Sequence, residues 1–306
     1  MYPNQSENSF KNHLIAIALA IVSCIAVLGA MNLLGLTAEQ QHAQNETLEV
    51  GDGLTVHFID VGQGDCILLT CDGKTMLIDG GSSDQGDRVV RYLKRAGVQR
   101  LDIVVSTHPH RDHVGGLDTV VQNFPIGKLY TPVTESDNAF FQDLVAACRT
   151  ANVKLTVPKA DSTFSLGGAT VTVLGPRGKY QEQENVNNMS IVLRVEYGEK
   201  AFLFTGDAEY DEETAILDAK CIVDVDVIKA GHHGSEDSTG SRLLLEATPA
   251  YCVISVGTGN EYGHPDEALL SRLEDADVEV LRTDEQGTIV CVTDGTDLRF
   301  ITEKAA

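Results

Sequence analysis

The stretch that decides the fold is Thr107-His108-Pro109-His110-Arg111-Asp112-His113, which directly follows the apolar run Leu101 to Ser106. Imidazole and carboxylate groups are the usual ligands of zinc and similar divalent ions. Because alternate side chains after a strand can converge on one point, His108 and His110 are expected to face one ion, and Asp112 and His113 another. A solvated loop is the alternative, but loops after buried strands often carry function. The stretch therefore predicts a metal site.

Three later segments repeat this pattern of an apolar run followed by a polar turn. The first ends in Asp207, which could serve as a bridging carboxylate or as the N-cap of the next helix. The second ends in the pair His232-His233 between glycines, which is an unusual place for core residues. The third leads to His264, which could be an active-site group or a neighbour of a helix N-cap. All are candidates for the same site.

The remaining chain alternates strand-like and helix-like segments. Short apolar runs between Gly and Asp turns predict strands, and apolar residues at helical spacing predict helices. Strands in both halves with helices between them indicate an α/β fold, a four-layer αββα sandwich whose two sheets form the core. The expected strands are 54–58, 66–69, 75–78, 101–105, 153–157, 169–174, 190–197, 201–204, 225–228, 251–256, 278–281, 288–292 and 298–301, and the expected helices are 87–96, 140–151, 211–218 and 265–273.

The first 36 residues stand apart from the rest. Leu14 to Met31 carries no charge and follows Lys11. A run of about 18 apolar residues suffices for a short membrane-spanning helix, and basic residues tend to stay in the cytoplasm. We therefore expect residues 1–36 to be a membrane anchor, with the domain outside the cytoplasmic membrane. A cleaved signal peptide and a secreted protein are the alternative. Residues 37–52 are expected to be a linker and 53–306 one folded domain.

Charge and cysteines narrow the chemistry further. The formal net charge of −22 argues against broad, salt-driven binding of polyanions. It does not exclude a phosphate substrate, because bound metal ions would dominate the local field. Six cysteines follow the apolar run. An exported domain could hold disulfides, whereas buried free thiols are as common in strands such as these, so both states stay open.

THPHRDHVGG (residues 107–116) resembles the HxHxDH motif of the metallo-β-lactamase superfamily. The motifs LIDGG (77–81) before it and TGD (205–207) after it keep the superfamily's order. The segments HFIDVGQGDCILL (57–69), NNMSIVL (187–193), KAGHHGS (229–235) and YGHP (262–265) resemble the ComEC-type branch, the hydrolase domain of the bacterial DNA-uptake channel protein. The resemblance covers roughly residues 53–302.

This resemblance implies a set of metal ligands. His108 and His110 would hold one ion, Asp112, His113 and a late histidine the other, with Asp207 between them. His233 is favoured over His232 as the late ligand, since the ligand of related proteins immediately precedes a glycine. Asp79 would orient a ligand histidine. A role for Gln63 and Asp65 beyond a structural turn stays open.

The chain departs from the wider superfamily at Asn187 and Asn188, where many members have a histidine that binds the first ion. Asparagine oxygen is a weaker ligand that suits harder ions. Two divalent ions are therefore expected, zinc or else manganese, with the first site partly filled.

The resemblance implies hydrolysis of a phosphodiester, including DNA, by a metal-activated water outside the membrane. Asp112 would orient that water or take its proton, with His232, His264 and Lys229 beside the phosphate. The alternatives are a metal-dependent hydrolase of another ester, namely a lactone, a thioester or a cell-wall phosphocholine ester, and a binding module without catalysis.

Overall fold

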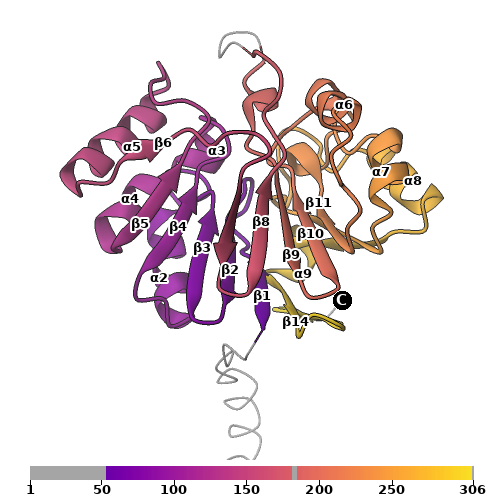
Figure 1. Cartoon of the computed structure of the whole chain (residues 1–306), viewed down its shortest axis with the longest axis horizontal. Helices are drawn as coiled ribbons and strands as arrows, with labels where there is room; N and C mark the ends of the chain where they lie inside the picture. The colour runs from indigo at the N-terminus through magenta and orange to yellow at the C-terminus, as the bar shows by residue number, and fades with distance from the viewer. Residues whose placement is uncertain (1–52, 181–184, 305–306) are drawn as a thin grey trace, which may run out of the picture. The chain divides into compact units, whose positions relative to one another are not determined.

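The computed structural model describes residues 53–180 and 185–304. Within these residues the chain forms two mixed sheets, and helices cover the outer face of each (Figure 1). The first sheet has the order β15-β14-β1-β2-β3-β4-β5-β6 and the second the order β13-β12-β11-β10-β9-β8-β7. This arrangement is the predicted αββα sandwich.

The strands of the first sheet are β1 (Leu54–Phe58), β2 (Ile67–Cys71), β3 (Lys74–Ile78), β4 (Leu101–Val105), β5 (Ile126–Tyr130), β6 (Leu155–Thr156), β14 (Ile289–Thr293) and β15 (Leu298–Thr302). Those of the second are β7 (Thr163–Leu166), β8 (Ala169–Val173), β9 (Leu193–Tyr197), β10 (Lys200–Phe204), β11 (Val227–Lys229), β12 (Tyr251–Ile254) and β13 (Glu279–Arg282). The α-helices are α2 (Gly86–Arg95), α3 (Arg111–Val114), α4 (Leu117–Asn123), α5 (Ala139–Thr150), α6 (Tyr210–Asp218), α7 (Ser241–Ala247), α8 (Glu267–Asp275) and α9 (Thr283–Gln286), with 3-10 turns η1 (Asn187–Met189) and η2 (Gly231–Gly234).

Three apolar layers hold the sandwich together. The central layer lies between the sheets, where Phe58 of β1 meets Phe204 of β10 at a ring distance of 6.2 Å. The second layer packs α2, α4 and α5 on the first sheet, and the third packs α6, α7 and α8 on the second. Strands such as β4 are apolar on both faces because each face lies against one of these layers.

Parallel pairing decides where the polar turns meet. In the first sheet β3, β4 and β5 run parallel, and in the second β10, β11, β12 and β13 do. Asp79 and Thr107 follow the carboxyl ends of β3 and β4, whereas Asp207 and His232 follow those of β10 and β11. The loops of both sheets therefore open on one common edge of the sandwich (Figure 1).

The predictions for the N-terminal segment and for the cysteines compare with the structure as follows. The anchor, or signal segment, of residues 1–36 and the linker of residues 37–52 lie outside the described residues. Among the residues that are described, no helix is both long enough and apolar enough to cross a membrane. The six cysteines of the domain are all free thiols, which settles the alternative that sequence left open.

Candidate metal centre

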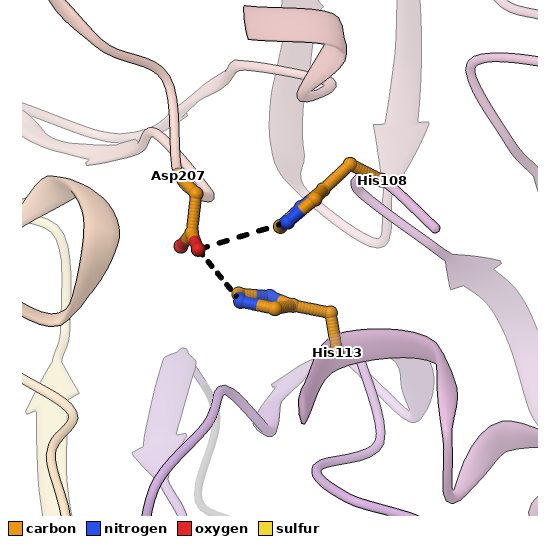
Figure 2. Close-up of side chains that lie close together, drawn as sticks. All are labelled: His108, His113 and Asp207. Atoms are coloured by element: carbon orange, nitrogen blue, oxygen red, sulfur yellow. Dashed lines mark hydrogen bonds and ion pairs between the residues drawn. The ribbon is translucent and has the colours of Figure 1, made fainter. Parts of the chain in front are cut away.

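Five side chains from both sheets meet at this common edge. His113, at the end of the short helix α3, has its Nε2 atom 3.1 Å from Oδ2 of Asp207 and 3.1 Å from Nε2 of His233. His108 contributes Nε2 at 3.6 Å from the same Asp207 oxygen. Asp112 completes the group, with Oδ2 3.2 Å from Nε2 of His233. Figure 2 shows the His108 and His113 rings both pointing toward the same oxygen of the Asp207 carboxylate.

A second group of contacts holds the histidine rings from behind. The Asp79 carboxylate accepts hydrogen bonds from Nδ1 of His113 at 2.9 Å and from the hydroxyl of Thr107 at 2.6 Å. With that proton donated to Asp79, the Thr107 oxygen accepts from Nδ1 of His108 at 3.1 Å. Nδ1 of His233 donates to the carbonyl of Ser255 at 3.0 Å. With Nδ1 engaged in this way, Nε2 is the nitrogen that each of the three histidines has available to bind a metal ion.

These nitrogen atoms fit divalent metal ions. Nε2 of His113 and Nε2 of His233 lie only 3.1 Å apart, so their lone pairs repel unless a proton on one ring or a metal ion bound by both offsets the repulsion. The Asp207 Oδ1 atom is also buried and lacks a hydrogen-bond partner among the described residues. Nitrogen and carboxylate donors in this proportion are those that zinc and related ions use. Candidate ligand groups are His108 with His113 and Asp207, and Asp112 with His113 and His233.

The charges of the buried cluster are strongly coupled. Burial alone would lower the pKa of His233, but Asp207 and its other carboxylate neighbours raise it to about 9. Burial would raise the pKa of Asp112, yet the hydrogen bond from His233 and the charge of His113 hold it well below its usual range. Desolvation and the charge of His113 lower the pKa of His108. Asp112 and Asp207 are therefore ionised, as metal ligands or bases must be.

Local backbone geometry turns the late histidines toward the cluster. His232 and His233 both lie in the left-handed region, with φ of 46° and 54°, which costs a non-glycine residue energy. This bend buries His233 and leaves the His232 side chain 28% exposed. His232 lies at the edge of the cluster, with Nε2 4.0 Å from Asp207 and Nδ1 3.7 Å from Glu209.

The remaining predicted residues surround this core. Nδ1 of His110 lies 3.0 Å from Nε2 of His108. The His264 ring lies edge-on to His232 at 5.5 Å, while Asp266 and Glu209 occupy the N-cap positions of α8 and α6. Asp207 is therefore not the N-cap of α6, whereas His264 lies two residues before the N-cap of α8 as well as beside His232. Asn187 donates to Glu209 at 2.7 Å and lies 3.5 Å from Nδ1 of His232, and its Oδ1 atom is buried without a partner in the described chain.

The structure corrects the expectation for Lys229 and extends that for Asp65. Lys229 does not face a substrate, because it is fully buried and its Nζ atom lies 2.6 Å from Asp65. It also donates to the carbonyl of Gly206 at 3.1 Å. Asp65 is 3.5 Å from Nδ1 of His233. The ion pair therefore lies directly behind the cluster. Its two residues are 164 positions apart, and no pattern in the sequence links them.

The turn that carries Asp65 is packed tightly against the histidine motif. The backbone N–H of Asp65 donates to the carbonyl of Asp112 at 3.1 Å. Gly64 precedes it with φ of 132°, and a Cβ atom there would lie 2.3 Å from the same carbonyl oxygen. Gln63 accepts from the backbone of Gly257 at 3.1 Å. The turn thus ties the first motif to the loop after β12.

Comparison with known proteins places the chain in a family that is consistent with a metal centre. Residues 59–257 match the family described as the metallo-beta-lactamase superfamily. The chain belongs to that superfamily. Its fold carries divalent metal ions in a hydrolase active site, so the chain is a metal-dependent hydrolase.

Its relatives include ComEC-type competence proteins. ComE operon protein 3 of Bacillus subtilis is 29% identical over 252 residues, which are 76% of this chain and 32% of that protein. Competence protein ComA of Neisseria gonorrhoeae is 32% identical over 234 residues, 75% of this chain and 31% of that protein. The chain thus spans about a third of the length of these relatives.

Solved structures share the fold. The metallo-beta-lactamase fold protein YhfI of Bacillus subtilis has a TM-score of 0.50 at 16% identity, covering 76% of this chain and 96% of its own. The diiron β-hydroxylase CmlA of Streptomyces venezuelae has a TM-score of 0.51 at 16% identity, covering 82% of this chain and 54% of its own. These likenesses concern the fold alone.

Proposed function

We propose that the chain is a phosphodiesterase or nuclease that acts outside the cytoplasmic membrane. The single observation that carries this proposal is the convergence of four side chains: Asp207 and His233 each lie 3.1 Å from His113, and His233 lies 3.2 Å from Asp112 and 3.6 Å from Asp207. Divalent ions bound there would supply an activated water and stabilise negative charge on phosphoryl oxygens. The names of the relatives, as competence proteins, favour a nucleic-acid phosphodiester as the substrate.

The proposed ligands follow from the two groups of donor atoms. His108, His110 and Asp207 hold the first ion, and Asp112, His113 and His233 hold the second, with Asp207 shared between them. His110 and His108 lie close together, 3.0 Å apart at their ring nitrogens, and Asn187, beside His232, offers only an amide. The first site is therefore the weaker of the two. Zinc suits the nitrogen donors, and manganese suits the amide and carboxylate oxygens.

Asp112, His232 and His264 carry the proposed chemistry. Asp112 is ionised and 26% exposed, so it can orient a water molecule and accept its proton. His232 and His264 lie on the open side of Asp207, where they can contact the phosphate and protonate the leaving oxygen. General acid–base groups of this kind contribute about 10²- to 10⁴-fold to rate.

The net charge of −22 favours a second candidate, because an acidic surface repels long DNA at low ionic strength. In that case the same centre would hydrolyse a small ester, such as a lactone, a thioester or a cell-wall phosphocholine ester. Both candidates share the metal ions and Asp112, so only the substrate separates them.

The test uses the full chain, purified with zinc or manganese. We expect cleavage of bis(4-nitrophenyl) phosphate and of DNA, and a loss of about 10²- to 10⁴-fold in kcat for Asp112→Ala. Asp84→Ala, at an exposed aspartate beside the motif, is the matched control. Hydrolysis of a lactone, thioester or phosphocholine ester without phosphodiester cleavage would replace this proposal with the second candidate.

We also propose that residues 1–36 anchor the domain outside the cytoplasmic membrane. The support is the uncharged run after Lys11. Protease added to intact cells is expected to digest the domain, while the same cells yield the protein in their membrane fraction. A cleaved signal segment would instead release the domain into the medium.

A further inference from the structure

An exposed tyrosine stands at the mouth of the centre. Tyr262 lies in the loop after β12, and 59% of its surface is open to solvent. Its ring stacks on His264, with centroids 5.8 Å apart and planes at 28°. His264 in turn contacts His232, which lies 4.0 Å from Asp207. Two successive ring contacts therefore connect the solvent-exposed Tyr262 with the edge of the proposed reacting centre.

The loop holds this ring in place before any ligand arrives. The side-chain oxygen Oδ1 of Asn260 accepts hydrogen bonds from the backbone N–H of Tyr262 at 3.2 Å and of His264 at 3.0 Å. Its amide donates to the carbonyls of Gly257 at 3.0 Å and of His264 at 2.6 Å. At the far end of the loop, the backbone N–H of Asp266 donates to the carbonyl of Gly234, next to His233, at 2.9 Å. A ring fixed in this way loses little entropy on binding.

Charged residues of the histidine motif affect the pKa of the Tyr262 hydroxyl. Burial and then the Asp112 carboxylate raise the pKa of the Tyr262 hydroxyl, and Arg111 opposes them. Tyr262 is therefore within electrostatic reach of the histidine motif, and the ring contacts through His264 and His232 connect it to the same centre. One face of the ring is covered by His264, which leaves the other face for a flat, apolar group.

We propose that Tyr262 is a stacking platform for a nucleobase next to the scissile phosphate, so that the preferred substrate is single-stranded DNA. This inference rests on the proposed phosphodiesterase function. Stacking of a base on an aromatic side chain contributes about 1–3 kcal/mol and tolerates any base. A base in a duplex is already stacked and must be extruded first, which costs a few kcal/mol. Tyr262 is thus a specificity residue, separate from the groups that hold ions or protons.

The experiment pairs a ring deletion with a base deletion. Substrates are a labelled single-stranded 12-mer and a series in which one nucleotide at a time is replaced by an abasic tetrahydrofuran unit. On the intact 12-mer we expect Tyr262→Ala to raise KM by about 5- to 150-fold, the equivalent of the stacking energy. Tyr262→Phe keeps the ring and is expected to stay near the wild-type KM.

One abasic position is expected to raise the wild-type KM by the same factor, and Tyr262→Ala is expected to add little further on that substrate. Binding of the same oligonucleotides to the Asp112→Asn variant, followed by fluorescence anisotropy, gives the affinities without turnover. Leu245→Ala removes another exposed apolar side chain, on α7, and should leave KM unchanged.

Three results would overturn the inference while leaving the phosphodiesterase intact. In one, Tyr262→Ala cleaves the intact 12-mer with the wild-type KM. In another, the rise in KM caused by Tyr262→Ala is as large on every abasic substrate as on the intact 12-mer. Cleavage of duplex DNA with a lower KM than single strands would also overturn it. If the wild-type chain cleaves no phosphodiester at all, the proposed function fails first and this inference fails with it.

Discussion

Nζ of Lys229 lies 2.6 Å from Oδ2 of Asp65, and both side chains are sealed from solvent directly behind the metal-ligand candidates. Burial would lower the pKa of Lys229, but Asp65 and Asp207 raise it. For Asp65, burial opposes ionisation, and the charge of Lys229 restores it, which lowers the pKa. Each charge is therefore tolerated in the interior only because of the other.

Removal of one partner of this pair should destabilise the domain strongly. Lys229→Met leaves the Asp65 carboxylate buried and unpaired, which costs about 3–5 kcal/mol in comparable pairs. Urea unfolding in the presence of a chelator measures this cost without a contribution from bound ions. The double variant Lys229→Met/Asp65→Asn should recover a large part of the loss. Strictly additive losses would show that the two side chains do not support each other.

Asp79→Asn should weaken metal binding without unfolding the protein. Asp79 accepts from both His113 and Thr107, and an amide cannot accept at both of its ends. The orientation of His113 and, through Thr107, that of His108 would be disturbed. Losses of about 10- to 100-fold in metal affinity are typical for such partners. Competition with a fluorescent chelator measures the affinity, with Asp84→Asn as the control, and equal affinities for both variants would contradict this role.

Asn187→His should strengthen the first metal site. The Asn187 side chain lies beside His232, and its oxygen has no partner among the described residues. An imidazole there adds a nitrogen donor that zinc prefers over an amide oxygen. After dialysis against limiting chelator, the variant is expected to retain more zinc per chain than the wild type, and Asn187→Ala no more than the wild type. Equal zinc content in all three would place the first ion elsewhere.

His57 should make the domain less stable in mild acid. It lies in β1, away from the metal centre, with Nδ1 2.9 Å from the Tyr92 hydroxyl, and burial lowers its pKa from 6.5 to about 4. Above pH 6.5 the ring is neutral in both states. Between pH 6.5 and 4 the unfolded chain binds a proton that the folded chain does not, so stability falls by up to about 3 kcal/mol.

The comparison of His57→Gln with the wild type isolates this effect from other titrating groups. The difference in their unfolding free energies should change across pH 6.5 to 4 and stay constant above pH 7. A constant difference at every pH would mean that His57 keeps the same pKa in the folded and unfolded states.

Regular elements with strong patterns could be predicted from the sequence. The apolar strands Leu54–Phe58 and Leu101–Val105 were predicted with their observed bounds, because burial on both faces leaves an uninterrupted run. β5 was missed, since Gly127 and Lys128 break its apolar pattern. The short helix α7 was also missed, because it has only two turns in which to show a period.

The site was predictable only in its inner part. Histidines and aspartates after strand ends carry a local signal, and His108, His113, Asp207 and His233 do lie together. The Asp65–Lys229 pair carries no such signal, because its partners come from different sheets and meet only in the folded chain. Tyr262 was noted as part of YGHP, but its exposure and its stacking on His264 are properties of the loop in three dimensions.

The centre draws its side chains from both sheets, with His108, Asp112 and His113 on one side and Asp207 and His233 on the other. An ion bound among them is thus also a cross-link between the two halves, in addition to their apolar seam and to polar contacts such as the Asp65–Lys229 pair. Metal supply would then govern the survival of the protein as well as its turnover. Cells short of the ion would lose the enzyme to proteolysis, and inactive, ion-free molecules would not accumulate.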